Sequence, residues 1–514
     1  MRLAAKFLQI AIEGMKKLPA VTAYTPEGKI LVGILRALLW IVHVFMHRKW
    51  AAPPPFFQED PRHYTFRDLL FFSYKYYFKP TEKSENTEGV EKIFRDNPPR
   101  FSVENVSENS DKNASENAKI ERTVTLAAAG DLMPYAWIQP QYCEHLWADI
   151  GDDFFSSDVT FANLETPIDV SKPPSLVPEV MLSNMLFNGD EAMFSIFNAD
   201  NFKTKTCKRV GFDILGTANN HSLDMDEAGV YATIDFLKNK NIQHVGTANS
   251  LENCNKTTII EREGIRLAFI SYTFSMNQKV NPTGKEWLVN HLEVNQLDVD
   301  LSRIKQDVAK SKQEGANFII LSLHYGNAYQ AYPCGHIVEN TKRIFEECGP
   351  DVILGGHPHN VQPMAAYPFT CPYTGVEKRG FVLFSFGDFA AYDIFNWCHL
   401  SVYLKLEISQ MSAASHKLQA TSGASFEAKK SQNTEGVIKN EKRTILTKVE
   451  AVPVYMCGIY RSRTDRELRF LDARKTMDLI ERGETPPFMT ARNVLEIKEL
   501  MQFYNSFFAK NIVA

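Results

Sequence analysis

The side chains best suited to chemistry in this 514-residue chain occupy one short turn, Gly355–His359, with the sequence GGHPH. Two histidines two positions apart in a tight turn can direct their imidazoles at two neighbouring metal ions. The glycines before them allow the backbone to approach closely. The same letters also suit a solvated surface turn, so the turn alone leaves metal binding and a surface role open.

A second candidate is the segment Ala218–Asp224, with the sequence ANNHSLD. The carbonyl oxygen of Asn220 can serve as a neutral metal ligand, and His221 beside it can donate a proton instead of binding metal. The competing interpretation is helix capping, because Asn220 and the polar residues after it suit a helix start. We expect capping for Asp226 and Ser222, whereas capping accounts poorly for His221.

Three further polar residues each follow an apolar run: Asp131, Glu165 and His324. Each is weak alone, because a polar residue in a strand-to-helix loop is usually structural. Together with Asn220 and the two histidines of the turn, they offer two carboxylates, one amide and three imidazoles. Such a set of oxygen and nitrogen ligands without thiolate favours Mn, Fe or Zn over Mg or a structural zinc.

Apolar strands that alternate with helical segments must bring these residues together. The runs that directly precede candidates are 123–129, 159–163, 212–216, 318–323 and 352–354. In α/β sheets, ligands gather beyond the carboxyl ends of the strands, so distant segments can present their polar tips at one edge. The alternation predicts an α/β domain, to which later hairpins add antiparallel strands.

Six motifs occur in order along the central region: GDLMP at 130–134, NLETP at 163–167, ANNHSLD at 218–224, HYGNAY at 324–329, GGHPHNVQP at 355–363 and FSFGDF at 384–389. Over about residues 121–410 this ordered set resembles the CapA family of the calcineurin-like metallophosphoesterase superfamily. The resemblance implies a four-layer α-β-β-α sandwich of two facing mixed sheets flanked by helices. It also implies a link to capsule polymers, notably poly-γ-glutamate.

The resemblance further implies two divalent metal ions bound by six side chains. The ligands would be Asp131 and His359 on one ion, Asn220, His324 and His357 on the other, and Glu165 between the two. The wider superfamily usually has a histidine at the position of Met133 and an aspartate as the bridging ligand. Both departures look typical of CapA-like proteins, but they weaken the first site, so occupancy by a single ion remains open.

The resemblance also implies catalytic roles outside the ligand set. His221 would protonate the leaving group as general acid, and Asn163 and Asp224 would orient neighbouring groups. The last motif has Asp388 where the family more often has asparagine. We expect this extra carboxylate to cap its turn rather than to add a metal ligand.

Composition divides the rest of the chain. We predict an N-terminal accessory segment with helical and aromatic character, a polar linker, the CapA-like domain, a low-complexity linker or insertion, and a partly helical C-terminal segment, over 1–80, 81–119, 120–408, 409–443 and 444–514. Within the first segment, residues 30–46 are apolar except for Arg36 and His43. Two interpretations stay open for this run: a membrane-associated helix, or a helix packed on the protein's own core.

The net charge of the whole chain argues against nucleic acid as a binding partner. The formal net charge is -4, so no global basic field attracts nucleic acid. We expect an anionic polymer or phosphoester as substrate, with a membrane surface and capsule-assembly proteins as further candidates. The location would be the membrane or cell envelope, with the cytoplasm as the alternative. The leading hypothesis is a metal-dependent hydrolase; the alternatives are a non-catalytic metal-binding component of an envelope-polymer assembly and a membrane-associated interaction protein.

Overall fold

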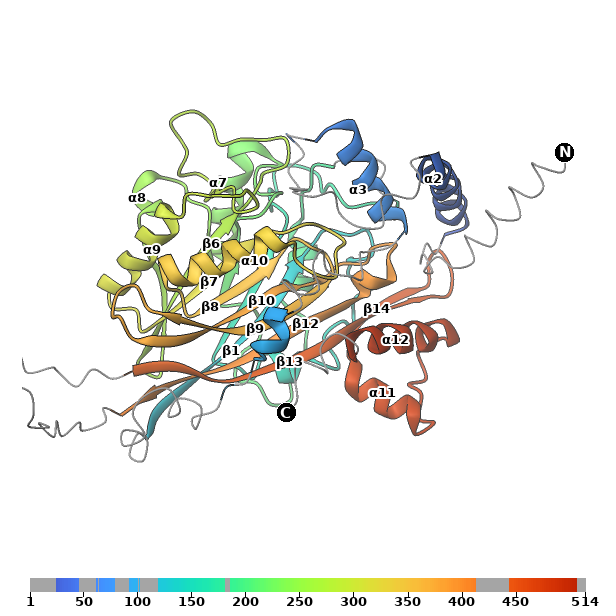
Figure 1. Ribbon diagram of the computed structural model, residues 1–514. Helices are drawn as coiled ribbons and strands as arrows, with labels where there is room; N and C mark the ends of the chain where they lie inside the picture. The colour runs from blue at the N-terminus through green and yellow to red at the C-terminus, as the bar shows by residue number, and fades with distance from the viewer. Residues whose placement is uncertain are drawn as a thin grey trace, which may run out of the picture.

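Two β-sheets face each other at the centre of the molecule, with helices outside them (Figure 1). This description rests on a computed structural model that describes residues 25–45, 62, 64–78, 92–99, 101, 119–180, 185–412 and 443–505. Most of the two predicted linkers, 81–119 and 409–443, lies outside the described residues.

The first sheet has the order β14-β13-β12-β1-β2-β3-β4, and β11 pairs with the end of β1. Strands β1 to β4 run parallel, whereas β12, β13 and β14 add an antiparallel half. The bounds are β1 Ile120–Leu132, β2 Val159–Leu164, β3 Ile214–Gly216, β4 Gln243–Val245, β11 Asp388–Ala390, β12 Leu400–Met411, β13 Arg443–Tyr460 and β14 Arg466–Asp472.

The second sheet has the order β5-β6-β7-β8-β10-β9. Its central strands β6, β7, β8 and β10 are parallel, and antiparallel β5 and β9 form the edges. The bounds are β5 Thr258–Arg262, β6 Ile265–Thr273, β7 Phe318–His324, β8 Val352–Gly356, β9 Val361–Thr370 and β10 Glu377–Phe386.

Strand β1 shows why the strands read as nearly continuous apolar runs. Val124, Leu126 and Ala128 point into the core between the two sheets, whereas Ala127 and Ala129 face the cluster on the outer side of the first sheet. A strand buried on both faces has no polar side, so its sequence loses the alternation typical of half-exposed strands.

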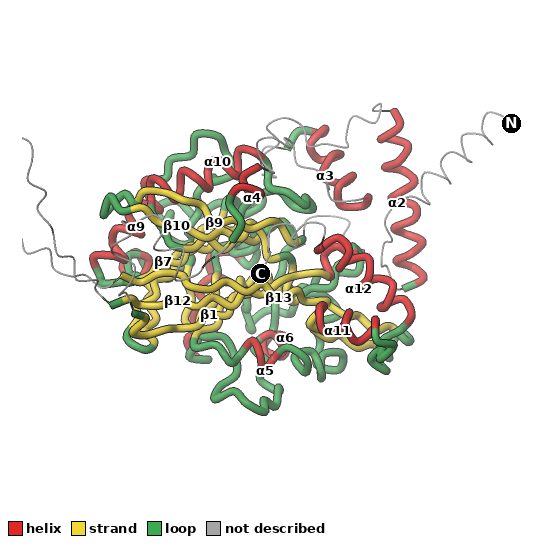
Figure 2. The backbone as a smooth tube through the Cα atoms, turned by 60° about the horizontal axis from the view of Figure 1, so that its bottom comes forward, coloured by secondary structure: helices red, strands yellow, loops and turns green. Residues whose placement is uncertain are grey.

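Helices complete the outer layers, as Figure 2 shows with α9 and α10 on one side of the strands and α5 and α6 on the other. Ile304 of α9 and Ile337 of α10 pack on the outer face of the second sheet, and Phe194 of α6 packs on the first. The predicted four-layer α-β-β-α sandwich is therefore confirmed. The helix bounds are α2 Pro26–Phe45, α3 Phe66–Phe78, α4 Lys92–Asp96, α5 Gly151–Phe154, α6 Glu191–Phe197, α7 Asp226–Asn239, α8 Leu251–Cys254, α9 Ser302–Gln313, α10 Gly335–Arg343, η4 Ile344–Cys348, η5 Asn396–His399, α11 Ala473–Glu481 and α12 Ala491–Tyr504.

Two regions differ from the predicted organisation. The sheet continues beyond residue 408, because β13 pairs with β12 along nearly its whole length and β14 follows. Within the predicted polar linker, α4 forms and Phe94 is buried against the second sheet, because Ile93 and Phe94 supply apolar surface that the surrounding composition hides. The helix expected near the C-terminus is observed as α12.

At the N-terminal end, α2 and α3 contact each other and lie beside the sandwich (Figure 1). Val32 of α2 belongs to one buried cluster with Phe395 and Tyr329, so residues 30–45 of the predicted run form a helix that packs on the body. Among the described helices, none combines the length and the apolarity that crossing a bilayer requires.

Candidate metal centre

The candidate ligands meet where the carboxyl ends of five strands converge. Asp131 lies at the end of β1, His324 is the last residue of β7, and the remaining ligands follow β2, β3 and β8. The register places Asp131 beside Asn163 on neighbouring strands of the first sheet. On the second sheet, His324 lies beside Gly356, which directly precedes His357. Parallel pairing within each sheet thus puts the polar tips at one edge, and all six predicted ligands are buried there.

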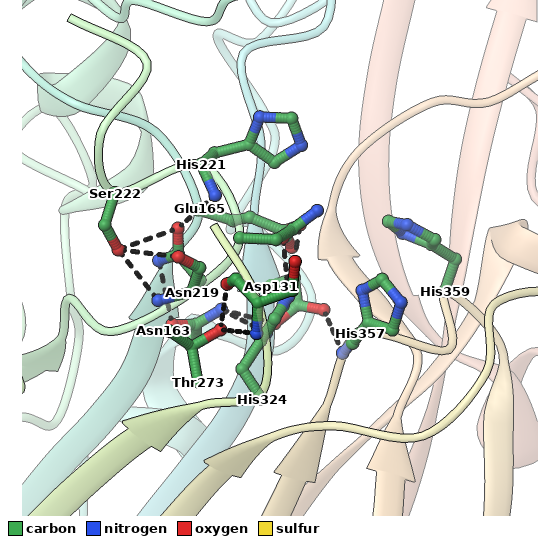
Figure 3. Close-up of polar contacts among 12 residues, drawn as sticks. Asp131, Asn163, Glu165, Asn219, His221, Ser222, Thr273, His324, His357 and His359 are labelled. Carbon is green, nitrogen blue, oxygen red and sulfur yellow. Dashed lines mark hydrogen bonds and ion pairs between the residues drawn. The ribbon is translucent and has the colours of Figure 1, made fainter. Parts of the chain in front are cut away.

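The side chains form two groups that share Glu165. In one group, ligand atoms of Glu165, His324 and His357 lie within 4.8 Å of one another. In the other, ligand atoms of Asp131, Glu165 and His359 do the same. Figure 3 shows His357 and His359 beside the carboxylates of Asp131 and Glu165.

Asn220 belongs spatially to the histidine-rich group. Its Oδ1 lies 2.8 Å from Nε2 of His324, and the same nitrogen lies 3.5 Å from Oε1 of Glu165. One nitrogen therefore faces both an amide oxygen and a carboxylate oxygen, as ligand atoms of a common ion would. The structure brings together all six residues that the sequence singled out.

The carboxylate of Glu165 is the strongest sign that this pocket suits cations. The side chain is fully buried, and neither of its oxygens accepts a hydrogen bond from the described residues. Burial raises the pKa of Glu165 against the opposing effect of the nearby imidazoles. Buried carboxylates normally have hydrogen-bond donors, so this one needs another partner of positive charge. The donor set of carboxylate, amide and imidazole fits a divalent cation.

Asp131 is held from two sides. Nδ2 of Asn163 donates to Oδ1 at 2.7 Å, and the backbone N–H of His357 donates to Oδ2 at 3.2 Å. Burial and the neighbouring Glu165 raise the pKa of Asp131 to about 7. A side chain at Gly356 would place its Cβ 2.8 Å from Oδ1 of Asp131, which explains the second glycine of the turn.

His324 is neutral in this setting, because burial lowers its pKa to about 3. Its Nδ1 lies 3.3 Å from Nδ2 of Asn163 and 4.0 Å from Oδ1 of Asp131, whereas Nε2 faces Asn220 and Glu165. A neutral imidazole binds a metal ion through its unprotonated nitrogen, so ligation through Nε2 requires the proton on Nδ1.

His359 differs from His324 in its partner. Its Nδ1 lies 2.9 Å from Oδ1 of Asp388, and its ring stacks on Tyr329 at a centroid distance of 5.3 Å. Burial alone would lower the pKa of His359, but Asp388 and the carboxylates of the site raise it to about 10. The expectation that Asp388 caps its own turn is wrong: the carboxylate orients His359 instead.

The turn that carries both histidines has an unusual backbone. His357 has φ 94° and His359 has φ 61°, both in the left-handed region that non-glycine residues avoid. Such conformations cost about 1–3 kcal/mol each and persist only where surrounding contacts fix them. The hydrogen bond from His357 to Asp131 and the pairing of His359 with Asp388 are contacts of this kind.

His221 lies at the outer side of the group, where Figure 3 places it apart from the turn histidines. Its Nδ1 lies 2.6 Å from Oδ2 of Asp224, which also accepts the backbone N–H of Phe187 at 2.6 Å. The ring stacks on Phe187 at 3.9 Å between centroids. Because Asp224 holds Nδ1, Nε2 is the nitrogen left to exchange a proton.

The capping interpretation of the same loop is wrong. Helix α7 begins at Asp226 without a side-chain hydrogen bond from its N-cap residue. Ser222 instead closes the loop on itself: it accepts from the N–H of Asn219 at 2.8 Å and donates to the carbonyl of Thr217 at 2.6 Å. These bonds fix the turn that presents Asn220 and His221.

Sequence reasoning missed three supporting residues. Asn277 accepts a hydrogen bond from Nδ2 of Asn220 at 3.2 Å, which directs Oδ1 of Asn220 to the site. Phe187 supports His221, and Tyr329 supports His359. Tyr329 lies within the motif HYGNAY, so the sequence offered a reason to consider it. Phe187 and Asn277 lie in loops without a distinctive sequence pattern.

Fold and site together define a four-layer α/β sandwich with a candidate metal centre at the strand ends. The model of the family described as bacterial capsule synthesis protein PGA_cap matches residues 125–393, which is more than half of the chain. The chain therefore belongs to this capsule synthesis family, and the resemblance to CapA proteins is confirmed.

Two curated relatives carry the same link in their names. The chain is 27% identical over 186 residues to the capsule biosynthesis protein CapA of Bacillus anthracis, covering 36% of this chain and 41% of that protein. It is 24% identical over 216 residues to the PGA biosynthesis protein CapA of Bacillus subtilis, covering 42% and 50%. The match thus spans half or less of the length of these relatives.

Among solved structures, the calcineurin-like phosphoesterase YfkN from Bacillus subtilis is similar over 76% of this chain and 98% of that chain, at 13% identity. The TM-score is 0.28, a level at which the likeness carries no weight of its own.

Proposed function

We propose that this protein is a metal-dependent hydrolase that binds two divalent cations, with Mn, Fe or Zn favoured by the ligand types, and acts in the synthesis of a capsule or envelope polymer. The observation that carries the proposal is the carboxylate of Glu165, which is buried, accepts no hydrogen bond from the part of the chain that the structure describes, and belongs to both ligand groups. A carboxylate in that position has an oxygen available for each of two ions.

The ligand assignment follows the two groups. Asp131, Glu165 and His359 would hold one cation, and Glu165, His324, His357 and Asn220 would hold the other. Two such ions supply Lewis acidity and a water molecule of lowered pKa. This chemistry suits the hydrolysis of a phosphoester or of an amide in an anionic polymer.

His221 has the contacts of a general acid. Asp224 fixes Nδ1 at 2.6 Å, so Nε2 is the nitrogen that can hold a proton for a leaving oxygen or nitrogen. Phe187 keeps the ring in one plane by stacking. Asp224 acts through His221 and is therefore a positioning residue.

The substrate class comes from the family and the relatives' names, which refer to capsule and PGA synthesis. We accordingly propose an anionic polymer of the poly-γ-glutamate kind or a phosphoester intermediate, together with capsule-assembly partners. The same link favours a place at the cell envelope over the cytoplasm.

A second candidate is a non-catalytic metal-binding component of an envelope-polymer assembly. The burial of all six ligand side chains favours it, because little of the centre is exposed to a large polymer. In that case the metal would hold two sheets together, and His221 would have no turnover to support.

Metal analysis combined with turnover separates the two candidates. The full chain, purified and reloaded with Mn²⁺, is assayed on a chromogenic phosphodiester and on poly-γ-glutamate, alongside His221→Ala. The hydrolase proposal expects two ions in both proteins and turnover only in the wild type. Equal rates in the two proteins would reject the general-acid role, and metal without turnover on either substrate would favour the assembly component.

A further inference from the structure

We propose that the outward face of α2 lies in the interfacial plane of a lipid bilayer with anionic headgroups. Four apolar side chains form this face: Ile30, Ile34, Leu38 and Ile41, which are 65, 53, 56 and 46% exposed. Their spacing of three and four residues puts them on one side of the helix. They thus make one continuous apolar stripe, the outer stripe.

The inner face of α2 explains why the outer stripe stays outside. Val32, together with Leu35 and Leu39, packs against the cluster that contains Ile394 and Phe395. At the start of the helix, the backbone N–H of Thr25 donates to Glu179 at 3.0 Å. The helix is therefore fixed to the body along one side and cannot turn the stripe inward.

A helix with apolar residues on two sides needs apolar surroundings on both. The protein covers the side of α2 that carries Val32, Leu35 and Leu39 and leaves the outer stripe exposed. Helix α3, which contacts α2, adds the exposed Phe66 and Leu69 to the apolar surface of this end. An apolar surface of this kind marks an interaction site. Because one side of α2 is committed to the protein, the stripe fits a helix that lies in the membrane surface rather than across the membrane.

The positive charge of the N-terminal region favours an anionic membrane over another protein as the binding partner. Residues 1–50 contain eight Lys and Arg but only two Asp and Glu, although the whole chain has a formal net charge of -4. An apolar stripe surrounded in sequence by basic residues is the pattern that binds anionic lipid, with apolar insertion and attraction to the headgroups acting together.

The position of α2 relative to the metal centre gives this surface a purpose. Tyr329 belongs to the cluster under α2, and its ring stacks on His359. Phe72 of α3 approaches the same ring, with a centroid distance of 6.0 Å. One aromatic side chain thus separates the membrane-docking helices from a ligand of the site. If the proposed function holds, the substrate is a phosphoester or polymer held at the membrane surface.

Flotation with lipid vesicles tests the docking surface without relying on turnover. The full chain is mixed with phosphatidylcholine vesicles, with or without phosphatidylglycerol, and compared with the double variant Ile34→Glu/Leu38→Glu. Leu251→Glu is the matched control, because Leu251 is 58% exposed and belongs to α8, far from α2 in Figure 1. Thermal melting and metal content check that all three proteins are folded.

We expect the wild type and Leu251→Glu to float with the phosphatidylglycerol vesicles. The double variant should bind them on the order of tenfold more weakly or worse, because two apolar contacts become charged. Equal flotation of the double variant and the wild type would overturn the proposal. So would a wild type that binds neither kind of vesicle but forms a dimer that the double variant abolishes, since the stripe would then bind a second copy of the chain.

Discussion

The two ligand groups of the metal centre share Glu165 but offer different donors. One is rich in nitrogen, with His324 and His357 next to the amide oxygen of Asn220. The other is rich in carboxylate, with Asp131 beside Glu165 and a single histidine. The groups would therefore present unlike environments to the two ions of the proposed centre.

Hydrogen bonding widens the difference. In the carboxylate-rich group, both oxygens of Asp131 already accept hydrogen bonds, and His359 is paired with Asp388. We infer that the nitrogen-rich group binds its ion more tightly, and that the carboxylate-rich group holds the exchangeable ion. The lesson is that a shared bridging ligand does not make two sites equivalent.

The largest effect should come from the residue that the groups share. Glu165→Gln keeps the shape of the side chain but removes its charge, so both ions should be lost and turnover should fall by more than about a thousandfold. Elemental analysis and the phosphodiester assay measure this. Glu377→Gln, at the exposed start of β10, is the matched control and should behave as wild type. Two ions in Glu165→Gln would remove the basis for a shared carboxylate.

Replacing one histidine of each ligand group distinguishes the two groups directly. His357→Ala should weaken binding of the tight ion, whereas His359→Ala should spare it and leave a protein with one ion. Calorimetric titration of the metal-free proteins with Mn²⁺ distinguishes the two cases. Loss of the same binding phase in both variants would show that the groups are not separate.

His221→Ala should leave both binding phases intact and reduce turnover by about 10²–10⁴-fold, the usual contribution of a general acid. The reason is that His221 contacts Asp224 and Phe187 rather than the ligand groups. Rates measured at saturating Mn²⁺ separate an effect on turnover from an effect on metal binding. A variant that lost metal instead would have to be reassigned to the ligand set.

A smaller effect is expected for Asp388→Asn, which replaces the carboxylate by an amide of the same shape. The amide still reaches Nδ1 of His359 but lacks the charge that makes the imidazole a stronger ligand. The exchangeable ion should therefore bind about 10- to 100-fold more weakly, while the affinity for the tight ion is unaffected. Titration with Mn²⁺ again gives both constants. An equal change in both phases would contradict a role confined to His359.

The smallest effect belongs to Asn277→Ala. Without its acceptor, the amide of Asn220 loses one of the contacts that orient it, and the tight ion should bind a few-fold more weakly, by about 1 kcal/mol. Asn277→Asp keeps an acceptor and serves as the control. No change in Asn277→Ala would mean that the loop alone orients Asn220.

The sequence predicted where the candidate ligands would meet, because their positions follow from strand ends. Asp131, Glu165 and His324 each follow an apolar run, and parallel pairing then forces them to one edge. The same logic fails for loops. Nothing in the letters around Asn277 or Phe187 indicates that they reach Asn220 and His221, because that depends on loop paths set by tertiary packing.

Helix capping and domain boundaries were harder to predict from the sequence, because they also depend on tertiary contacts. Ser222 and Asp226 have the right chemistry for a helix start, yet Ser222 spends its hydrogen bonds inside the loop before α7. Strand β13 pairs with β12 across a segment of 30 or so residues whose composition reads as a boundary. Local composition therefore separated two neighbours that hydrogen bonding joins in one sheet.

Anomalous diffraction from crystals of the full chain soaked in Mn²⁺ tests the central claim most directly. The account predicts two anomalous peaks that flank the carboxylate of Glu165, with the peak beside His324 and His357 the stronger. A single peak away from Glu165, or none at this edge of the sandwich, would contradict it.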